Sequence, residues 1–337
     1  MIRSRRIFNN PDNVVTEMLE GYVSANRDVI ALSDGLVVRA TPKRAGLVGL
    51  VVANGSGHEP AMVGWVGHGL LDVNVPGPVF SAPGPGPIVA GIKAADRGAG
   101  VLLLVSSHAG DIMNGILAIS DASSAGLTAE MVVVYDDVAS GPAERPTSRR
   151  GGAGLFFVWK IVGALAERGG SLAECVAMAE RVRDGTRSIA AAIGTIAHPV
   201  TGEPLGSARA DTFSIGMGVH GEGGMPVAAD TSADTIAELA IARLVDDLAP
   251  AEGSRVGLIV NNSGSLTLME LSILYRGAQT ALEKRRVEVA RSWIGSYATT
   301  FDLAGFAFAI SALDQELESL YDDPAHGAGF VRVGHVS

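Results

Sequence analysis

The chain has 337 residues, of which 47% are hydrophobic, 18% are charged and 43 are glycine. This composition is typical of a tightly packed soluble protein and excludes a disordered chain. The net charge of -10, with 26 basic and 36 acidic residues and no basic stripe interleaved with aromatics, argues against a nucleic-acid partner.

The sequence gives no sign of export or of a membrane. Residues 1–8 are partly basic, but no apolar stretch follows them, so we expect neither a signal peptide nor an anchor. No later segment is apolar over the roughly 20 residues that a membrane helix needs. Cys175 is the single cysteine and cannot form an internal disulfide, so we expect a core thiol in a reducing cytoplasm.

In the first half of the chain, predicted helices alternate with buried strands. This βαβ alternation predicts a largely parallel sheet, and an open sheet of this kind builds its site at the carboxyl ends of its strands. The predicted helices cover 11–26, 88–97 and 112–124, and the predicted strands cover 46–53, 101–105 and 131–135. Polar clusters follow all three strands, at 54–60 (NGSGHEP), 106–111 (SSHAGD) and 136–137 (DD).

The second half repeats this organisation after two helical patterns at 155–168 and 171–183. A helix is predicted over 234–248, and a strand over 256–260 ends in the polar run 261–264 (NNSG). The length favours two domains, each of roughly 100 to 200 residues. We therefore expect two α/β domains, 1–184 and 185–337, each with a central parallel or mixed sheet flanked by helices.

Several common sites are absent from the sequence. There is no Gly-Lys pair, which excludes the phosphate-binding loop of Walker-type nucleotide sites. The Gly-x-Gly pairs at 55–57 and 216–218 lack the third glycine of a dinucleotide fingerprint. No cluster of Cys or His has the spacing of metal ligands, so we expect no metal site.

The turn at 54–60 has two further readings. Ser56, a histidine and Asp111 could form a nucleophile, base and orienter, but the nucleophile-elbow pattern Gly-x-Ser-x-Gly fails at its first glycine. Alternatively, the small residues allow the backbone to approach a ligand or another strand closely. By the same structural reasoning, Asp111 is expected to cap the helix that follows it.

An ordered set of motifs resembles the dihydroxyacetone kinases, specifically their substrate-binding (K) domain or subunit. The similarity runs through nearly the whole chain in the right order. It is carried by 55–61 (GSGHEPA), 110–114 (GDIMN), 136–139 (DDVA) with 149–154 (RRGGAG), 215–222 (IGMGVHGE), 260–264 (VNNSG) and 304–306 (AGF).

The resemblance implies specific roles for three residues. His220 would add through its imidazole to the carbonyl of a small ketone, forming a hemiaminal that polyols cannot form. Asp111 would accept the proton of the terminal hydroxyl, and His58 would hydrogen-bond the substrate. The substrate pocket is expected at Gly55, Ser56, Gly57, Ala82, Ser106 and His108.

The resemblance also implies the partners. This chain would hold the ketose and bind no cofactor, while a separate helical nucleotide-binding subunit would bring the phosphoryl donor, either ATP-Mg or a phosphoenolpyruvate-fed donor. A cytoplasmic homodimer is expected. The alternative is a catalytically silent ketone sensor or transcriptional co-regulator of the same fold.

The chain departs from the family pattern around the pocket. Where family members commonly have three glycines, a Lys-Asn-Tyr stretch, and a Ser-Pro pair, this chain has Ala53-Asn54-Gly55, residues 106–109 (SSHA), and Ala82-Pro83. The common Pro in the turn after His220 is Gly223 here. Smaller groups at Ala82 and Ser106 favour a larger substrate, for example a four-carbon ketose such as erythrulose, in place of or beside dihydroxyacetone.

Overall fold

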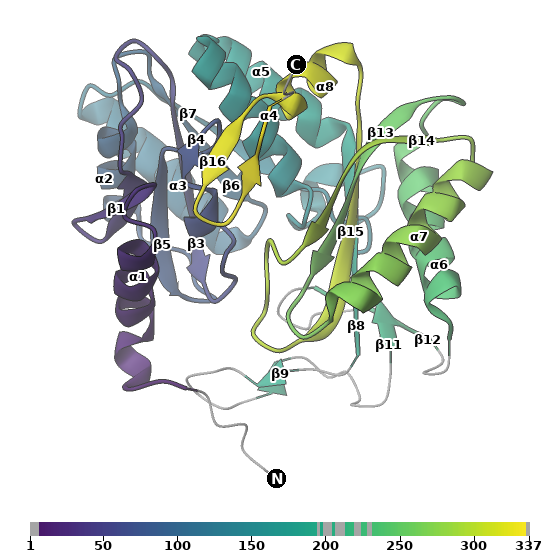
Figure 1. Cartoon of the computed structure of the whole chain (residues 1–337). Coiled ribbons are helices and arrows are strands. Elements are labelled where there is room, and N and C mark those ends of the chain that lie inside the picture. The colour runs from purple at the N-terminus through teal and green to yellow at the C-terminus, as the bar shows by residue number, and fades with distance from the viewer. Residues whose placement is uncertain are drawn as a thin grey trace.

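The computed structural model describes residues 7–193, 196–197, 204–205, 213–218, 224–227 and 231–334. Two six-stranded sheets lie side by side, with helices on their outer faces and between them (Figure 1). The fold is the mixed α/β architecture that the alternation of strands and helices predicts. Within the described residues, no helix is both long and apolar enough to cross a membrane.

The first sheet is largely parallel, as predicted. Its strand order is β1-β2-β5-β3-β6-β7, in which β5, β3, β6 and β7 are parallel and β1 and β2 form an antiparallel edge. The strands are β1 (Ile30–Ser33), β2 (Leu36–Arg39), β3 (Gly49–Ser56), β5 (Val73–Val79), β6 (Val101–Ser106) and β7 (Ala129–Val134).

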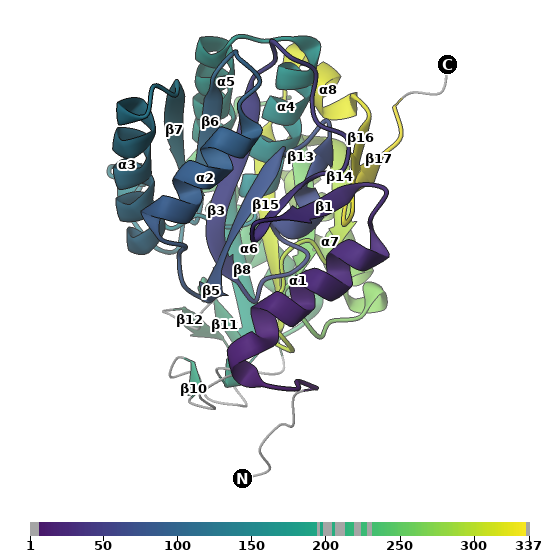
Figure 2. The ribbon, with the colours of Figure 1, turned by 90° about the vertical axis from the view of Figure 1, so that its left-hand side faces the viewer.

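Helices cover both faces of this sheet, which explains the unbroken apolar run of its central strand. The helices of this half are α1 (Val14–Ala25), α2 (Pro85–Ala95), α3 (Ala109–Ser124), α4 (Leu155–Arg168) and α5 (Leu172–Asp184). In β6, Leu102 and Leu104 pack on the side of α4 and α5, whereas Leu103 and Val105 pack on the side of α2 and α3. Figure 2 shows α2 and α3 on the outer side of the sheet.

Strand β3 extends three residues further than the sequence predicts. The predicted strand ends at Ala53, but Gly55 and Ser56 continue the ladder by pairing with Gly77 and Val79 of β5. Glycine at position 55 permits this, because a Cβ there would lie 2.5 Å from the backbone nitrogen of Ser81. The expectation of a glycine turn that begins at residue 54 is therefore wrong, and the chain leaves the sheet only after Ser56.

The second sheet is mixed. Its order is β12-β11-β8-β15-β13-β14, in which β13 and β14 are parallel and the other pairs are antiparallel. The strands are β8 (Thr186–Ile193), β11 (Phe213–Ile215), β12 (Met225–Val227), β13 (Arg255–Asn262), β14 (Glu288–Gly295) and β15 (Ala304–Ala312). Helices α6 (Ala233–Leu248) and α7 (Leu268–Lys284) cover its outer face, and a short pair, β9 (Ile196–Ala197) and β10 (Pro204–Leu205), stands apart.

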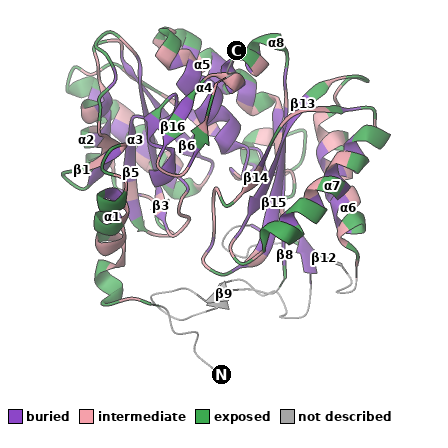
Figure 3. Cartoon of the chain, viewed as in Figure 1, coloured by how far each residue is buried: buried purple, intermediate pink, exposed green. Residues whose placement is uncertain are grey.

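Helix α4 lies between the two sheets and is buried along almost its whole length (Figures 1 and 3). Its apolar residues share one core with Leu50 and Leu104 of the first sheet and Ile259 and Ala309 of the second. A helix that is hydrophobic on all sides is expected where it is packed on all sides. The two sheets are thus joined through this helix.

The chain returns to the first half near its end. After α8 (Gln315–Asp322), strand β16 (Ala325–Gly327) pairs with both β17 (Val331–Arg332) and β4 (Gly67–His68). Phe330 stacks on Trp65 with ring centroids 4.5 Å apart. Helix α5 ends at Asp184 and β8 begins at Thr186, close to the boundary expected between domains, but the division into 1–184 and 185–337 remains a prediction.

Candidate active site

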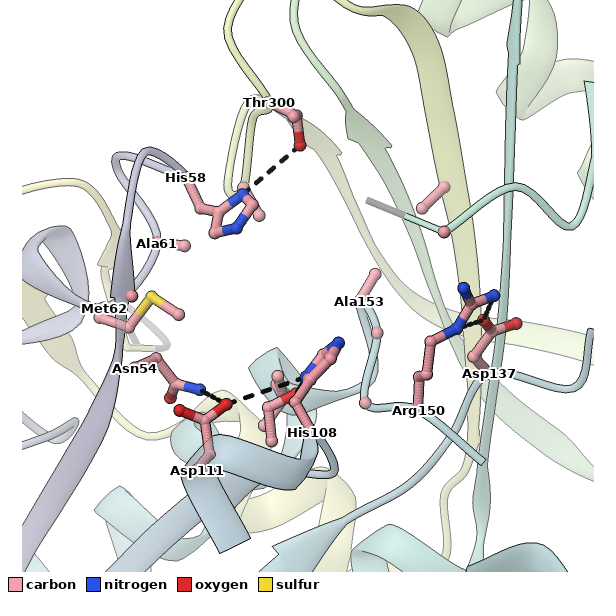
Figure 4. Close-up of a pocket in the computed structure, with 18 of the residues that line it drawn as sticks. Asn54, His58, Ala61, Met62, His108, Asp111, Asp137, Arg150, Ala153 and Thr300 are labelled. Carbon is pink, nitrogen blue, oxygen red and sulfur yellow. Dashed lines mark hydrogen bonds and ion pairs between the residues drawn. The ribbon is translucent and has the colours of Figure 1, made fainter. Parts of the chain in front are cut away.

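A cavity of about 490 Å³ lies between the two halves (Figure 4). It is lined from the first half by the ends of β3 and β6, the loops after them and α4, and from the second half by residues of β8, β13 and β15 and their loops. The predicted residues Gly55, His58, Ala82, Ser106, His108 and Asp111 all line it. The second half contributes Ser188, Ala190, Met217, Gly218, Asn261, Ser263, Ala298, Thr300 and Ala307.

His58 is held by a loop of the second half. Its Nδ1 lies 2.9 Å from the carbonyl oxygen of Thr299 and 3.4 Å from Oγ1 of Thr300, and its ring centroid is 5.0 Å from that of Phe80. A carbonyl oxygen only accepts hydrogen bonds, so Nδ1 carries the proton in the neutral ring and Nε2 is the acceptor. In Figure 4 the ring lies across the cavity from Asp111 and His108.

The loop that holds His58 is itself fixed by an asparagine at the end of β13. Oδ1 of Asn261 accepts hydrogen bonds from the backbone nitrogens of Tyr297 and Ala298, both at 2.9 Å, and its Nδ2 donates to the carbonyl of Ala298 at 2.7 Å. Thr299 Oγ1 also donates to the carbonyl of Glu59 at 2.7 Å. The orientation of a first-half histidine therefore depends on a second-half strand end.

Asp111 lies in the first turn of α3, whose N-cap residue is His108. The expectation that Asp111 caps this helix is therefore wrong. Its side chain reaches across to β3, where Nδ2 of Asn54 donates to its Oδ2 at 3.0 Å. Asp111 is 6% exposed, and its carboxylate lies at a helix N-terminus, where backbone dipoles stabilise a negative charge.

Ser106 and His108 form a pair beside this carboxylate. Oγ of Ser106, the last residue of β6, lies 3.0 Å from Nδ1 of His108. The same nitrogen lies 3.9 Å from Oδ2 of Asp111. A Cβ at Gly151 would lie 2.3 Å from Oγ of Ser106, so the 151–154 loop packs directly against this strand end.

Two of the predicted pocket residues are placed in the wall behind the cavity. Ser56 is buried and its Oγ donates to the carbonyl of Gly77 at 2.8 Å, which ties β3 to β5. Gly57 has a φ of +102, and a Cβ there would lie 2.7 Å from the ring of Phe80. Neither is among the described residues that line the cavity. They support the loop that carries His58.

The wall opposite Asp111 carries an ion pair. Nη2 of Arg150 lies 2.8 Å from Oδ2 of Asp137, and both residues line the cavity. Burial raises the pKa of Asp137, and Arg150 opposes that change. Next to it, fully buried Asp136 accepts hydrogen bonds from the backbone nitrogens of Gly152 and Gly154 at 2.7 Å, and burial raises its pKa as well.

His220 lies outside the described residues. The structure places Met217 and Gly218, which precede it in the chain, in the cavity wall. Within the described part of the chain, no group of three His, Cys, Asp or Glu side chains could hold a metal ion.

Sequence reasoning missed Thr299, Thr300 and Asn54 as parts of the site. Asn261 stood in a polar run after a predicted strand, which is the same signal that singled out Asp111. Thr299 contacts His58 through its backbone carbonyl, and because every residue has one, the residue type at 299 does not predict this contact. Asn54 began the polar run after the first predicted strand and departed from the family pattern, but no role was assigned to its side chain.

Comparison with known proteins decides the family. Residues 20–329 match the Dak1 domain. The chain belongs to the Dak1 family. It is 37% identical to the dihydroxyacetone-binding subunit DhaK of PTS-dependent dihydroxyacetone kinase 1 from Listeria innocua, over 93% of this chain and 95% of that protein. The resemblance to the substrate-binding subunits of dihydroxyacetone kinases is thereby confirmed.

Other relatives carry different names. An L-erythrulose kinase of Pectobacterium atrosepticum is 34% identical over 98% of this chain, which spans only 57% of that longer protein. Among solved structures, the dihydroxyacetone kinase of C. freundii has a TM-score of 0.87 at 29% identity, covering 98% of this chain and 60% of that one. The dihydroxyacetone kinase operon co-activator Dha-DhaQ has the same TM-score at 27% identity, covering 95% and 98%.

Proposed function

We propose that this Dak1 chain is the ketose-binding subunit of a dihydroxyacetone-type kinase. It binds a short-chain ketose as a hemiaminal on His220 and presents a terminal hydroxyl of the ketose to Asp111. The phosphoryl group comes from a separate nucleotide-binding subunit. The observation that carries the proposal is that His58 and Asp111 line one cavity between the two halves, with the acceptor nitrogen of His58 set by Thr299.

The chemistry balances without a cofactor on this chain. Addition of the imidazole N–H of His220 across the ketone C=O forms one C–N bond and turns the carbonyl oxygen into a hydroxyl, so nothing leaves. In the transfer step, the terminal hydroxyl oxygen attacks the phosphorus of the donor, the bond between that phosphorus and the rest of the donor breaks so that the donor leaves without its phosphoryl group, and the hydroxyl proton passes to the carboxylate of Asp111. Phosphoryl transfer through a loose transition state depends mostly on such positioning.

The donor is proposed to be bound elsewhere. The sequence lacks the Gly-Lys of a phosphate-binding loop. The Listeria innocua relative is named as PTS-dependent, whereas the C. freundii kinase was solved in complex with AMP-PNP and Mg2+ in a longer chain, of which this chain covers 62%. Both donors are therefore candidates for the partner subunit of this chain.

The substrate is proposed to include a four-carbon ketose. Ala82 lines the cavity and offers no side-chain hydroxyl, and relatives named L-erythrulose kinase and D-erythrulose kinase are each 34% identical to this chain. Kinetic comparison of erythrulose with dihydroxyacetone, using a cognate donor subunit, tests this point. Equal or better turnover of dihydroxyacetone would overturn the preference for erythrulose but not the kinase assignment.

The decisive experiment separates binding from transfer. Native mass spectrometry of the intact chain with a ketose, or NMR titration with a ketose labelled with 13C at its carbonyl carbon, reports the adduct, and phosphorylation with the donor subunit reports transfer. We expect His220→Ala to lose the adduct, and Asp111→Asn to keep it while losing transfer. An adduct that persists in His220→Ala would contradict the covalent assignment. Because only a neutral imidazole adds to a carbonyl, ketone binding is expected to weaken in acid.

The second candidate function is a ketone sensor that acts through protein contacts. It is favoured by the similarity to the Dha-DhaQ co-activator, which has a TM-score of 0.87. Asp111 favours the kinase, because a sensor needs no proton acceptor at the substrate hydroxyl. A chain that forms the adduct but supports transfer with no donor subunit would establish the sensor.

The proposed setting is a homodimer in the cytoplasm. The single thiol, Cys175, is buried and burial raises its pKa to about 11, so it suits a structural role in a reducing compartment. Sedimentation equilibrium of the purified chain tests the dimer, and cell fractionation tests the location.

A further inference from the structure

Asn54 is the polar group of β3 nearest to the proposed proton acceptor. It is 5% exposed and lines the cavity, and its Nδ2 donates to Oδ2 of Asp111 at 3.0 Å. The two residues come from different elements, β3 and α3, so the hydrogen bond fixes the carboxylate of the helix relative to the sheet. Figure 4 shows this hydrogen bond as a dashed line between Asn54 and Asp111, at the lower left of the view.

The chemistry of this contact suits a proton acceptor. An ionised carboxylate only accepts hydrogen bonds, so it orients the amide with Nδ2 toward it. A neutral amide directs the carboxylate without neutralising it, whereas a Lys or Arg partner would make it a poorer base. A second polar group near the carboxylate, Nδ1 of His108, lies 3.9 Å from Oδ2 of Asp111 and 3.0 Å from Oγ of Ser106. Asn54 is thus the closest of these contacts to the carboxylate.

We propose that Asn54 is a positioning residue for phosphoryl transfer, which holds one oxygen of Asp111 so that the carboxylate faces the hydroxyl of the bound ketose. The proposal rests on the proposed kinase function. It predicts that Asn54 acts on transfer and not on formation of the ketone adduct, since its amide donates to Asp111, the residue proposed to act in transfer.

The test compares Asn54→Ala, Asn54→Asp and the control Asn74→Ala. Asn74 is a buried asparagine of the adjacent strand β5, 3% exposed, and is not among the described residues that line the main cavity. We expect Asn54→Ala to lower kcat about 10-fold or more, as expected for loss of a hydrogen bond to a charged group, with ketone binding little changed. Asn74→Ala is expected to retain kcat.

The pH profile distinguishes positioning from a general structural role. In Asn54→Ala the acid limb of the kcat profile moves to higher pH, because the carboxylate form loses a donor. In Asn54→Asp both carboxylates are ionised near neutral pH and repel each other, so activity is lost, and it recovers toward acid where one proton on the pair restores a donor to Asp111. Activity profiles that move to higher pH in Asn54→Ala and to lower pH in Asn54→Asp support the proposal. Identical kcat–pH profiles in the two variants, or an unchanged kcat in Asn54→Ala, overturn it.

A direct measurement keeps the two hypotheses separate. If the unsubstituted chain transfers no phosphate with any donor subunit, the kinase function fails. The contact is then tested by 13C NMR titration of the Asp111 carboxyl carbon, assigned with Asp111→Asn. A titration that moves to higher pH in Asn54→Ala, but not in Asn74→Ala, supports the positioning role, and an unmoved titration overturns it.

Discussion

Nδ1 of His58 lies 2.9 Å from the carbonyl oxygen of Thr299, although 241 residues separate the two in sequence. Through this contact, a loop of the second half orients the ring of His58, which follows a strand of the first sheet. It also assigns the proton of the neutral ring to Nδ1 and leaves Nε2 to accept from a ligand. The loop is in turn fixed by Asn261, so the chain of contacts can be tested by substitution.

Asn261→Ala is expected to disorient His58. It removes three hydrogen bonds to the backbone at Tyr297 and Ala298. We expect a loss of about 1 to 3 kcal/mol in the free energy of unfolding and a larger fall in kcat/KM than this loss alone would cause. Thr299→Val keeps the carbonyl that contacts His58 and should have the smaller kinetic effect. The reverse order of effects would contradict the proposed control of His58 by this loop.

Gly55→Ala is expected to disturb the substrate side of the cavity. The new Cβ would lie 2.5 Å from the nitrogen and 2.9 Å from the oxygen of Ser81, so backbone must move. Such overpacking costs about 1 to 3 kcal/mol, and displacement of the 80–83 loop should raise the KM for the ketose. The matched control is Gly86→Ala, where a Cβ meets nothing within 4 Å. Thermal unfolding and steady-state kinetics of both variants decide the matter.

Asp247→Asn is expected to destabilise the loop on the far wall of the cavity. Asp247 accepts two hydrogen bonds from Arg149, which is 2% exposed, and a third from Arg187. Loss of the counter-charge of a buried arginine costs about 3 to 5 kcal/mol. These arginines lower the pKa of Asp247, so its stabilisation is present at neutral pH and is lost in acid.

The control for this substitution is Asp246→Asn, which changes the same charge at an exposed neighbouring position. It should alter the free energy of unfolding by no more than about 0.5 kcal/mol. Denaturant unfolding at pH 7 and at about pH 2 measures both variants, and the penalty of Asp247→Asn should shrink at the lower pH, because the pKa of Asp247 lies below its ordinary value of 3.8. A penalty that is equal at both pH values would show that the charge of Asp247 is not its cause.

Lys160→Met is expected to change how stability depends on pH. Lys160 is completely buried in α4, where its Nζ donates to the carbonyl of Leu320 at 2.7 Å, and burial lowers its pKa from 10.5 to about 8. Between these values the unfolded chain binds more protons than the folded one, so stability rises with pH. Relative to Lys160→Met, the unsubstituted chain should gain about 2 kcal/mol between pH 7 and pH 9.5.

Chemical denaturation of both forms across this range provides the measurement. Lys160→Met also leaves the carbonyl of Leu320 without its donor, so the two forms can differ at any single pH for that reason. The difference between pH values isolates the titration of Lys160. Parallel pH curves for the two forms would contradict the assignment.

The parts of the fold that were predicted are those that follow from local pattern. The apolar run of β6 and the polar residues after it predicted both a buried strand and the place of Asp111. The end of β3 was mispredicted because Gly55 and Ser56 are typical of turns, whereas close approach to β5 keeps them in the ladder. Local residue preference is overridden there by packing between strands.

The contacts that join distant segments were beyond prediction from one sequence. Nothing in the residue pattern pairs Arg149 with Asp247, or Asn54 with Asp111, because each pair is formed only when α6 or α3 packs against its neighbours. The carbonyl of Thr299 is still harder to foresee, since every residue has one. Sequence reasoning therefore found several residues of the site but not the residues that orient them.

The pairing of β16 with β4 bears on how the protein folds as it is made. Gly67 and His68 emerge from the ribosome early, whereas their partners, His326 and Gly327, are among the later residues synthesised. The ring of Trp65 likewise lacks the stacking of Phe330 until then. The first half must therefore remain incomplete until this late segment is released, and part of its apolar surface stays uncovered during synthesis.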